Sequence, residues 1–178
     1  GRATPLLSRP PPMGAAAVVL CAEAYARRKG LSARVRIAGQ GFTSDTPGSF
    51  TGDMRHVVGS DLTVAAAAQA YAQAGVGPAD IPVVELHDCF TANELITYES
   101  LGLTPEGTAE KFIMDGNNTY GGTHVTNPSG GLLSTGHPLG ATGLAPCAAP
   151  TRPLRGPAGR PPAGAPRPPP HPHPRHRP

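Results

Sequence analysis

The sequence predicts an α/β domain in which helices and a sheet form layers. Ala-rich or amphipathic helical patterns occupy residues 61–74 and 92–101, and the apolar run between them, 81–86, has the length and β-branched content of a buried strand. Helices that alternate with strands form layers because each element has an apolar face that a neighbour must cover.

The N-terminal part of this domain is predicted to hold a helix, a short strand and a long loop. Residues 14–29 are Ala-rich, carry basic residues in the last turn and are followed by Gly30, which are signals of a helix end. Residues 33–41 alternate in polarity as a short strand does. Residues 43–60 contain Gly, Pro, Ser and Asp without periodicity, which predicts a loop, and long loops are often functional.

The middle of the chain gives the clearest helix and strand patterns. Asp61 is placed to cap a helix that ends at Gly75. Residues 81–86 are apolar enough for a strand that is covered on both faces of a sheet.

Two further helices are predicted after this strand. Thr91 is placed to cap a helix over 92–101, with Glu94 at the capping-box position. The Thr-Pro-Glu sequence at 104–106 predicts the start of another short helix, because proline suits the first helical position.

The composition changes abruptly at Pro146. Residues 146–178 contain thirteen prolines, six arginines and three histidines, and neither Asp nor Glu. Such a segment cannot bury enough apolar surface to offset the entropy of ordering it, and its prolines lack backbone donors. We therefore predict three parts: an irregular segment at 1–13, a domain at 14–145 and a disordered Pro/Arg-rich tail at 146–178.

The basic character of the chain comes from this tail. The net charge is +3 and the isoelectric point is near 9.0. Without the six tail arginines, nine basic and twelve acidic residues remain in residues 1–145. A domain with more acidic than basic residues has no electrostatic footprint for nucleic acid, so no nucleic-acid partner is predicted.

Cysteine content and apolar runs exclude other classes. Cys21, Cys89 and Cys147 are too few and too scattered for a disulfide scaffold or a paired Cys-x-x-Cys zinc site, which favours a reducing compartment and no metal. The longest apolar run, 14–24, is too short to cross a bilayer, so no membrane span is predicted.

Residues suited to acyl transfer lie at the ends of the predicted elements. His87 and Cys89 follow the buried strand, at the edge where open α/β sheets present functional groups. The Asn-Pro-Ser-Gly-Gly turn at 127–131 lets backbone approach a ligand closely, and His137 lies in a glycine-rich loop. Two histidines, one thiol and exposed backbone amides suit acyl transfer, which needs a nucleophile, a base and oxyanion donors.

Each of these residues also has a purely structural interpretation. A cysteine after a core strand is commonly a small buried hydrophobe, and loop histidines commonly bond to backbone. The glycines are consistent with ordinary turns. Side-chain chemistry alone therefore gives a layered α/β domain with a candidate site at His87, Cys89 and His137.

Two motifs resemble those of one enzyme family. The first is His-Asp-Cys-Phe at 87–90, within the run VVELHDCFTANELITYESLGL, and it stands where most thiolases have Asn-Glu-Ala-Phe. The second is GHPLGATG at 136–143. The first motif is characteristic of thiolases of the sterol carrier protein x type, and the second of thiolases generally. Residues 14–145 therefore look like the C-terminal half of such a thiolase. The resemblance implies layered helices on a mixed sheet, incomplete here because the tail stands where the family has two closing strands.

The resemblance implies thiolytic cleavage of a 3-oxoacyl-CoA. A cysteine thiolate attacks the 3-keto carbonyl, acetyl-CoA or propanoyl-CoA leaves, and a second CoA takes the acyl group. His137 would activate the nucleophilic cysteine, His87 would position water or donate to an oxyanion, and Cys89 would act as acid and base at the leaving carbon. Acyl-CoA and CoA are then the binding partners, and coenzyme A is a substrate and not a bound cofactor.

The family places its nucleophilic cysteine in an N-terminal half that this sequence does not resemble. Cys21 lies within the first helical pattern and matches no nucleophile motif, so a packing role is predicted for it. We therefore expect the chain alone to be inactive. The alternative function is that of a noncatalytic fragment or lipid-associated remnant.

The resemblance also implies a homodimer and a peroxisomal location. The C-terminal His-Arg-Pro is not a peroxisomal signal of the Ser-Lys-Leu type, so cytoplasmic or mitochondrial locations stay open.

Trypsin tests the predicted tail. If residues 146–178 are disordered, cleavage should be fastest at Arg155 and Arg175 and should then occur at Arg55 in the predicted loop. The arginines that precede proline should resist: Arg152, Arg160, Arg167 and Arg177. Mass spectrometry of a digestion time course would show this order. Protection of Arg155 and Arg175 would contradict it.

Overall fold

The computed structural model of the chain describes residues 13–32, 35–50 and 52–148. Its elements in chain order are α1 (Glu23–Arg28), η2 (Pro47–Phe50), α2 (Met54–Val57), α3 (Ser60–Ala74), η3 (Pro78–Asp80), β1 (Val83–Val84), α4 (Thr91–Ser100), α5 (Ala109–Met114), β2 (Val125–Thr126), α6 (Gly131–Thr135) and α7 (Leu139–Thr142). Nearly all of the predicted N-terminal segment and tail lies outside the described residues.

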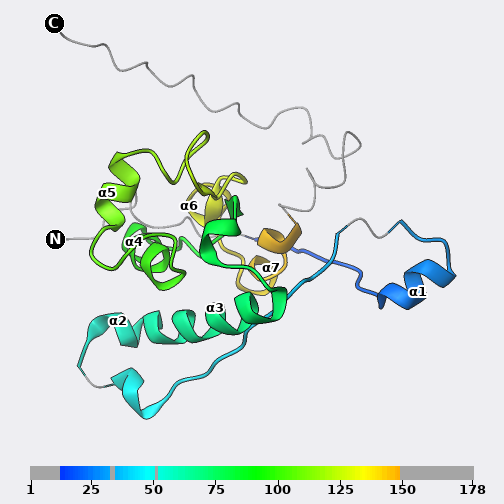
Figure 1. Ribbon diagram of the computed structural model, residues 1–178, viewed down its shortest axis with the longest axis horizontal. Coiled ribbons are helices and arrows are strands. Elements are labelled where there is room, and N and C mark those ends of the chain that lie inside the picture. Colours follow the sequence, from blue (N-terminus) through cyan, green and yellow to red (C-terminus); the bar gives the residue numbers. More distant parts are fainter. Residues whose placement is uncertain (1–12, 33–34, 51, 149–178) are drawn as a thin grey trace, which may run out of the picture.

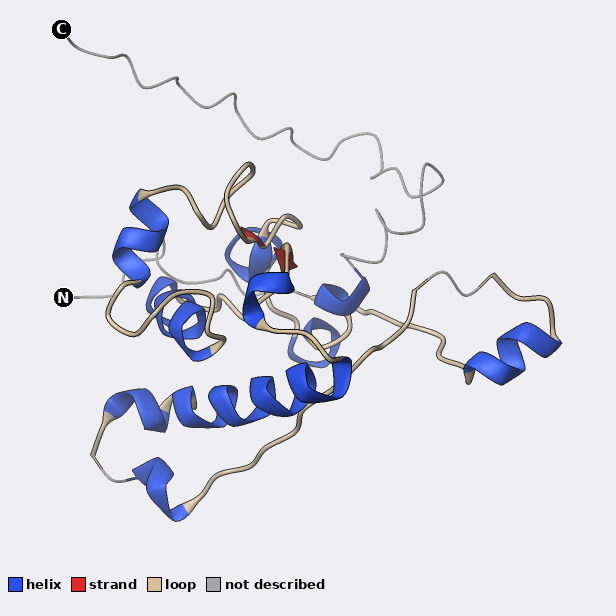
Figure 2. Ribbon diagram, viewed as in Figure 1, coloured by secondary structure: helices blue, strands red, loops and turns tan. Residues whose placement is uncertain are grey.

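The helices form two groups around a very small sheet. Helix α3 lies on one side of the molecule, and α4, α5 and α6 lie together on the other side. Helix α1 projects away from both groups (Figure 1). The two strands lie among the second group of helices and are joined to them by long loops (Figure 2). The α/β class predicted from the sequence is confirmed.

The sheet is smaller and simpler than predicted. In the described part of the chain it has two parallel strands, β1 and β2, with Val83 opposite Val125 and Val84 opposite Thr126. The mixed sheet is therefore not observed there. The strand predicted over 81–86 is regular only at Val83 and Val84, and it is not covered on both faces, because Val83 is 41% exposed.

The predicted helices α3 and α4 are confirmed, but their caps differ from the prediction. Gly75 ends α3 as expected, with a φ of +69° that suits glycine. Asp61 lies in the first turn, whereas the cap position is Gly59. At α4 the cap position is Phe90, and Glu94 accepts a hydrogen bond from the Tyr98 hydroxyl instead of closing a capping box.

The N-terminal predictions were only partly right. The helix predicted over 14–29 forms only at its C-terminal end, as α1, because the residues before it include β-branched Val18 and Val19 and offer no side-chain cap. Its stop at Gly30 is confirmed by a φ of +64°. The predicted loop at 43–60 contains η2 and α2, so Arg55 lies in a helix, where Asp53 caps it by accepting from the Arg55 amide at 2.8 Å.

Residues 35–41, the described part of the second predicted strand, are extended but join no sheet. They run along α3, where Gln73 bonds to both the amide and the carbonyl of Gln40, and Gln69 accepts from the Phe42 amide. A side chain at Gly39 or Gly41 would collide with α3 backbone. Helix side chains thus bond to the backbone of Gln40 and Phe42 in place of a neighbouring strand.

The short helix predicted at 104–106 begins later in the chain. Gly107, with a φ of +77°, interrupts the helical conformation, and α5 starts at Ala109. Among the described residues, no helix has both the length and the apolar character needed to cross a membrane.

Tyr98 is the centre of the hydrophobic core. Its ring is fully buried and lies 5.1 Å from the ring of Phe112, within a cluster completed by Leu86, Leu103 and Ala109. Its hydroxyl donates to Glu94 and accepts from Asn118 Nδ2 at 3.1 Å. Burial raises the pKa of Tyr98 well above its usual range, and the bond to Glu94 raises it further.

Replacing Tyr98 by Phe tests this core. The change keeps the ring and removes both hydrogen bonds, so we expect unfolding free energy to fall by about 1–3 kcal/mol. Tyr120→Phe is the matched control, because Tyr120 is 60% exposed and should change stability by less than about 0.5 kcal/mol. Urea unfolding followed by circular dichroism measures both. Equal losses for the two variants would contradict the assigned role of the hydroxyl.

Candidate active site

The loop that follows β1 places one predicted site residue on each side of a buried carboxylate. His87 is exposed, Asp88 is only 4% exposed and Cys89 is half-buried. The backbone of this loop is held from α4, because Asn93 Nδ2 donates to the His87 carbonyl. Leu86, directly before the loop, belongs to the core.

Asn127 joins the end of β1 to the Asn-Pro-Ser-Gly-Gly turn. Its amide donates to the Val84 carbonyl at 2.7 Å, and its side-chain oxygen accepts from the Leu86 amide at 2.8 Å. Its φ of +47° is in the left-handed region, which asparagine tolerates better than most residues. Nearby, the Glu85 carboxylate accepts from the amide and the hydroxyl of Ser129.

The Asp88 carboxylate binds the N-terminus of α6. It accepts from the Leu132 amide at 2.7 Å and from the Leu133 amide at 3.5 Å. These two amides are therefore occupied by Asp88. Gly131 is required at this contact, since a Cβ at its φ of +63° would lie 2.1 Å from Asp88 Oδ2.

His137 follows α6 and is held by α7. Its Nδ1 lies 2.6 Å from the Thr142 hydroxyl oxygen, and that hydroxyl donates to the Pro138 carbonyl at 2.9 Å. Thr142 is 7% exposed, whereas His137 is partly exposed. The ring therefore has a buried anchor and stands at the surface.

The two loops bring His87 and His137 together. Their ring centroids are 4.7 Å apart with the planes at 82°, an edge-to-face contact between residues that are far apart in the sequence. Cys89 lies on the same loop as His87, two positions further along the chain. The structure thus joins two of the three predicted residues in direct contact and places the third beside them in the chain, and their catalytic roles stay predictions.

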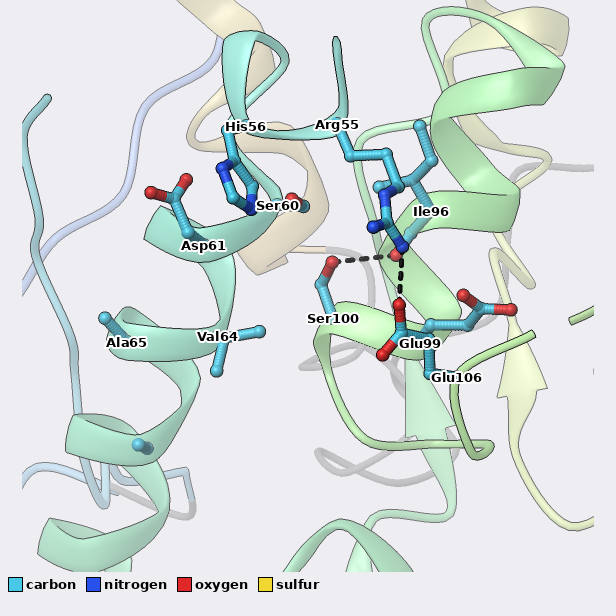
Figure 3. Close-up of a pocket in the computed structure, with 11 residues that line it drawn as sticks. Arg55, His56, Ser60, Asp61, Val64, Ala65, Ile96, Glu99, Ser100 and Glu106 are labelled. Atoms are coloured by element: carbon cyan, nitrogen blue, oxygen red, sulfur yellow. Dashed lines mark hydrogen bonds and ion pairs between the residues drawn. The ribbon is translucent and has the colours of Figure 1, made fainter. Parts of the chain in front are cut away.

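A cavity of about 430 Å³ lies elsewhere, between α2, α3 and α4 (Figure 3). Its lining consists of Arg55, His56, Ser60, Asp61, Val64, Ala65, Ala68, Ile96, Glu99, Ser100 and Glu106. Three of these residues are acidic, and the one arginine is paired with Glu106 and with Asp53 outside the cavity. The side-chain hydrogen bond that Arg55 donates to Asp53 lowers the pKa of Asp53 to about 2.

This cavity does not suit acyl transfer. Its excess of carboxylates repels anions, and neither of the contacting histidines nor Cys89 lines it. The His56 Nδ1 atom is buried there without a hydrogen-bond partner among the described residues. We therefore place the candidate site at the two loops and not at the cavity.

Sequence comparison identifies the family to which these loops belong. The family described as "Thiolase C-terminal domain-like" matches residues 44–166. The chain belongs to the thiolase C-terminal domain-like family. The predicted resemblance is confirmed by this match, while the predicted domain boundaries at 14 and 145 stay predictions.

Relatives of this thiolase-like chain carry two kinds of name. Sterol carrier protein 2 from Bos taurus is 52% identical over 149 residues, which are 83% of this chain and 27% of that protein. Benzoylsuccinyl-CoA thiolase subunit BbsB from Thauera aromatica is 45% identical over 142 residues, 80% of this chain and 36% of that protein. The thiolase-like chain therefore spans roughly a quarter to a third of these relatives.

One further relative and one solved structure also match the chain. Acetyl-CoA acetyltransferase from Methanothermobacter thermautotrophicus is 40% identical over 147 residues, 83% of this chain and 38% of that protein. A solved structure titled "Ltp2-ChsH2(DUF35) aldolase" covers 57% of this chain, and the match spans 27% of that structure's chain, at 33% identity and a TM-score of 0.49.

Three positioning residues of the thiolase-like site were missed by the sequence analysis: Asp88, Asn127 and Thr142. Asp88 was visible between two singled-out residues, but its partners lie in a distant turn. The sequence signal for Thr142 was its position four residues after Pro138. At that spacing a threonine hydroxyl in a helix donates to the earlier carbonyl.

Gly131→Ala tests the contact between Asp88 and α6. The added methyl must displace the Asp88 carboxylate and so lose its bond to the Leu132 amide. Gly30→Ala is the matched control, because Gly30 has nearly the same φ, +64°, with nothing within 4 Å. Both variants incur left-handed strain, and we expect Gly131→Ala to lose about 1–3 kcal/mol more in chemical denaturation. Equal losses would contradict the contact.

Proposed function

We propose that this chain supplies His87, Cys89 and His137 to the active site of a thiolase-type acyltransferase. The substrates are a 3-oxoacyl-CoA and CoA, and the products are a shortened acyl-CoA and acetyl-CoA or propanoyl-CoA. The observation that supports this proposal best is the contact of the His87 and His137 rings, 4.7 Å apart at their centroids. Two independent loops present these bases together at the surface.

His137 serves as the base for the first half of the reaction. It takes the proton of a cysteine thiol, and the thiolate attacks the 3-keto carbon of the substrate. The C2–C3 bond then breaks, which leaves the shortened acyl group on the cysteine as a thioester and the electron pair on C2 of the departing CoA ester. His87, exposed beside His137, donates a hydrogen bond to the carbonyl oxygen on which negative charge develops.

Cys89 completes the proton balance. Its thiol gives a proton to C2, so that acetyl-CoA or propanoyl-CoA leaves as a neutral product. The resulting thiolate takes the proton of the incoming CoA thiol, whose sulfur attacks the thioester and releases the acyl-CoA and the nucleophilic thiolate. A half-buried thiol two residues along the chain from His87 suits such an exchange.

The nucleophilic cysteine comes from outside this constellation. Cys21 lies two residues before α1, which projects away from α6 and α7 (Figure 1). Cys147 is exposed, and its thiol donates to the Gly143 carbonyl at 3.3 Å. Because the matched segments cover only 27% and 38% of these relatives, the remainder of such a protein can provide the nucleophile.

A second function, lipid association without catalysis, has comparable support. It is suggested by the names of relatives, Sterol carrier protein 2 and, from Caenorhabditis elegans, "Non-specific lipid-transfer protein-like 2", which is 43% identical over 150 residues. In that case the two loops are an inherited structure without turnover. Homodimer formation and a peroxisomal location accompany either function as part of the proposal.

Thiolysis of acetoacetyl-CoA tests the acyltransferase proposal. The 178-residue chain alone should stay at background, because acid and base groups without a nucleophile lack the covalent step. A hybrid in which residues 44–145 replace the matching segment of the Methanothermobacter acetyltransferase should turn over. In that hybrid, His137→Gln and Cys89→Ser should each lower kcat at least roughly a hundredfold.

Tyr120→Phe in the hybrid is the control, because Tyr120 is exposed and lies outside the site. A folded hybrid whose turnover is unaffected by the His137 and Cys89 variants would contradict the proposed roles. Binding of a fluorescent fatty acid by a folded hybrid without turnover would instead support lipid association.

A further inference from the structure

We propose that Thr142 is a positioning residue that holds the His137 imidazole in the tautomer protonated on Nδ1. The inference rests on the proposed function of His137 as a base, and it adds which ring nitrogen accepts the proton.

Two short contacts of one hydroxyl carry the argument. The Thr142 Oγ1 atom lies 2.6 Å from His137 Nδ1 and 2.9 Å from the Pro138 carbonyl oxygen, and both distances are within hydrogen-bonding range. The residue is 7% exposed, so its hydroxyl has little access to solvent. The contact with Pro138 is the usual bond of a helical threonine to the carbonyl four residues earlier.

The hydroxyl has a single proton, which decides the direction of both bonds. A carbonyl oxygen only accepts, so the bond to Pro138 uses the proton of Thr142. Oγ1 can then offer the ring only a lone pair, and His137 Nδ1 must be the donor. The opposite arrangement, in which the hydroxyl donates to Nδ1, leaves the contact with Pro138 without a proton.

A neutral imidazole protonated on Nδ1 carries its lone pair on Nε2. Nε2 is therefore the atom at which His137 takes a proton from a thiol. Because the Nδ1 side is anchored on the buried end of α7, the ring turns its other edge away from that anchor. In this orientation the ring meets His87 edge to face, with the two planes at 82°.

The chain contains an internal reference and a matched control. His124 Nδ1 lies 2.7 Å from the Ile81 carbonyl oxygen, which can only accept, so His124 must also be protonated on Nδ1. The Thr135 hydroxyl bonds to the Gly131 carbonyl at 2.7 Å, in the manner of Thr142 and Pro138, but its bonds are to backbone carbonyls and not to a ring.

Nitrogen NMR of the 178-residue chain labelled with ¹⁵N-histidine tests the proposal, because two-bond proton–nitrogen correlations distinguish the two tautomers. Signals are assigned with single His→Gln variants, at a pH where the rings are neutral. His137 should show the same Nδ1-protonated pattern as His124. That pattern should persist in Thr142→Ser and Thr135→Val, and Thr142→Val should lose it while His124 keeps its own.

Two results would overturn the proposal. One is an Nε2-protonated His137 in the unaltered chain, and the other is an unchanged His137 pattern in a Thr142→Val variant that retains the His124 pattern. If Thr142→Val unfolds, as loss of the His124 pattern would show, the unaltered chain and Thr142→Ser still decide the question. The spectra need no turnover, so a hybrid without thiolysis would contradict the proposed function and leave the tautomer assignment standing.

Discussion

The bond between the Asp88 carboxylate and the first amides of α6 determines the arrangement of the site. Burying a carboxylate costs free energy unless hydrogen-bond donors compensate it. The first amides of a helix are such donors, because they have no partner within the helix. Each therefore satisfies the other, at 2.7 Å for the Leu132 amide. Because Asp88 lies between His87 and Cys89, and α6 leads directly to His137, this one contact fixes the separation of the two site loops.

Side chains extend the pairing of the two strands beyond the sheet itself. The parallel ladder is regular for only two residues on each strand, yet Asn127 and Glu85 continue the connection through bonds to Leu86 and Ser129. A two-stranded sheet of this length is weak alone. Its polar extensions hold the Asn-Pro-Ser-Gly-Gly turn in place, so the turn has a structural role.

Several features that depend on residues close together in the sequence were predicted correctly. The boundaries of α3 and the existence of α4 follow from Ala-rich or amphipathic sequence and from Gly75, and motifs picked out His87 and His137. Predictions failed where distant side chains compete for the backbone: Gln73 takes both the amide and the carbonyl of Gln40, within the strand predicted at 33–41. Asp88 was missed as a positioning residue for the same reason, since its partners lie more than forty residues along the chain.

The extended segment that runs along α3 affects which part of the molecule unfolds locally. Its described bonds to the helix come from Gln69 and Gln73, one helical turn apart on one face, and from the Thr43 hydroxyl, which donates to the Leu62 carbonyl at 3.1 Å. Both glutamine contacts are exposed to water, which can replace each of them at small cost. We therefore expect the segment to detach from α3 more readily than the Tyr98 core or the Asp88 contact opens. Amide protons at 39–42 would then exchange with solvent far sooner than those of the core, and the outer face of α3 would become accessible without global unfolding.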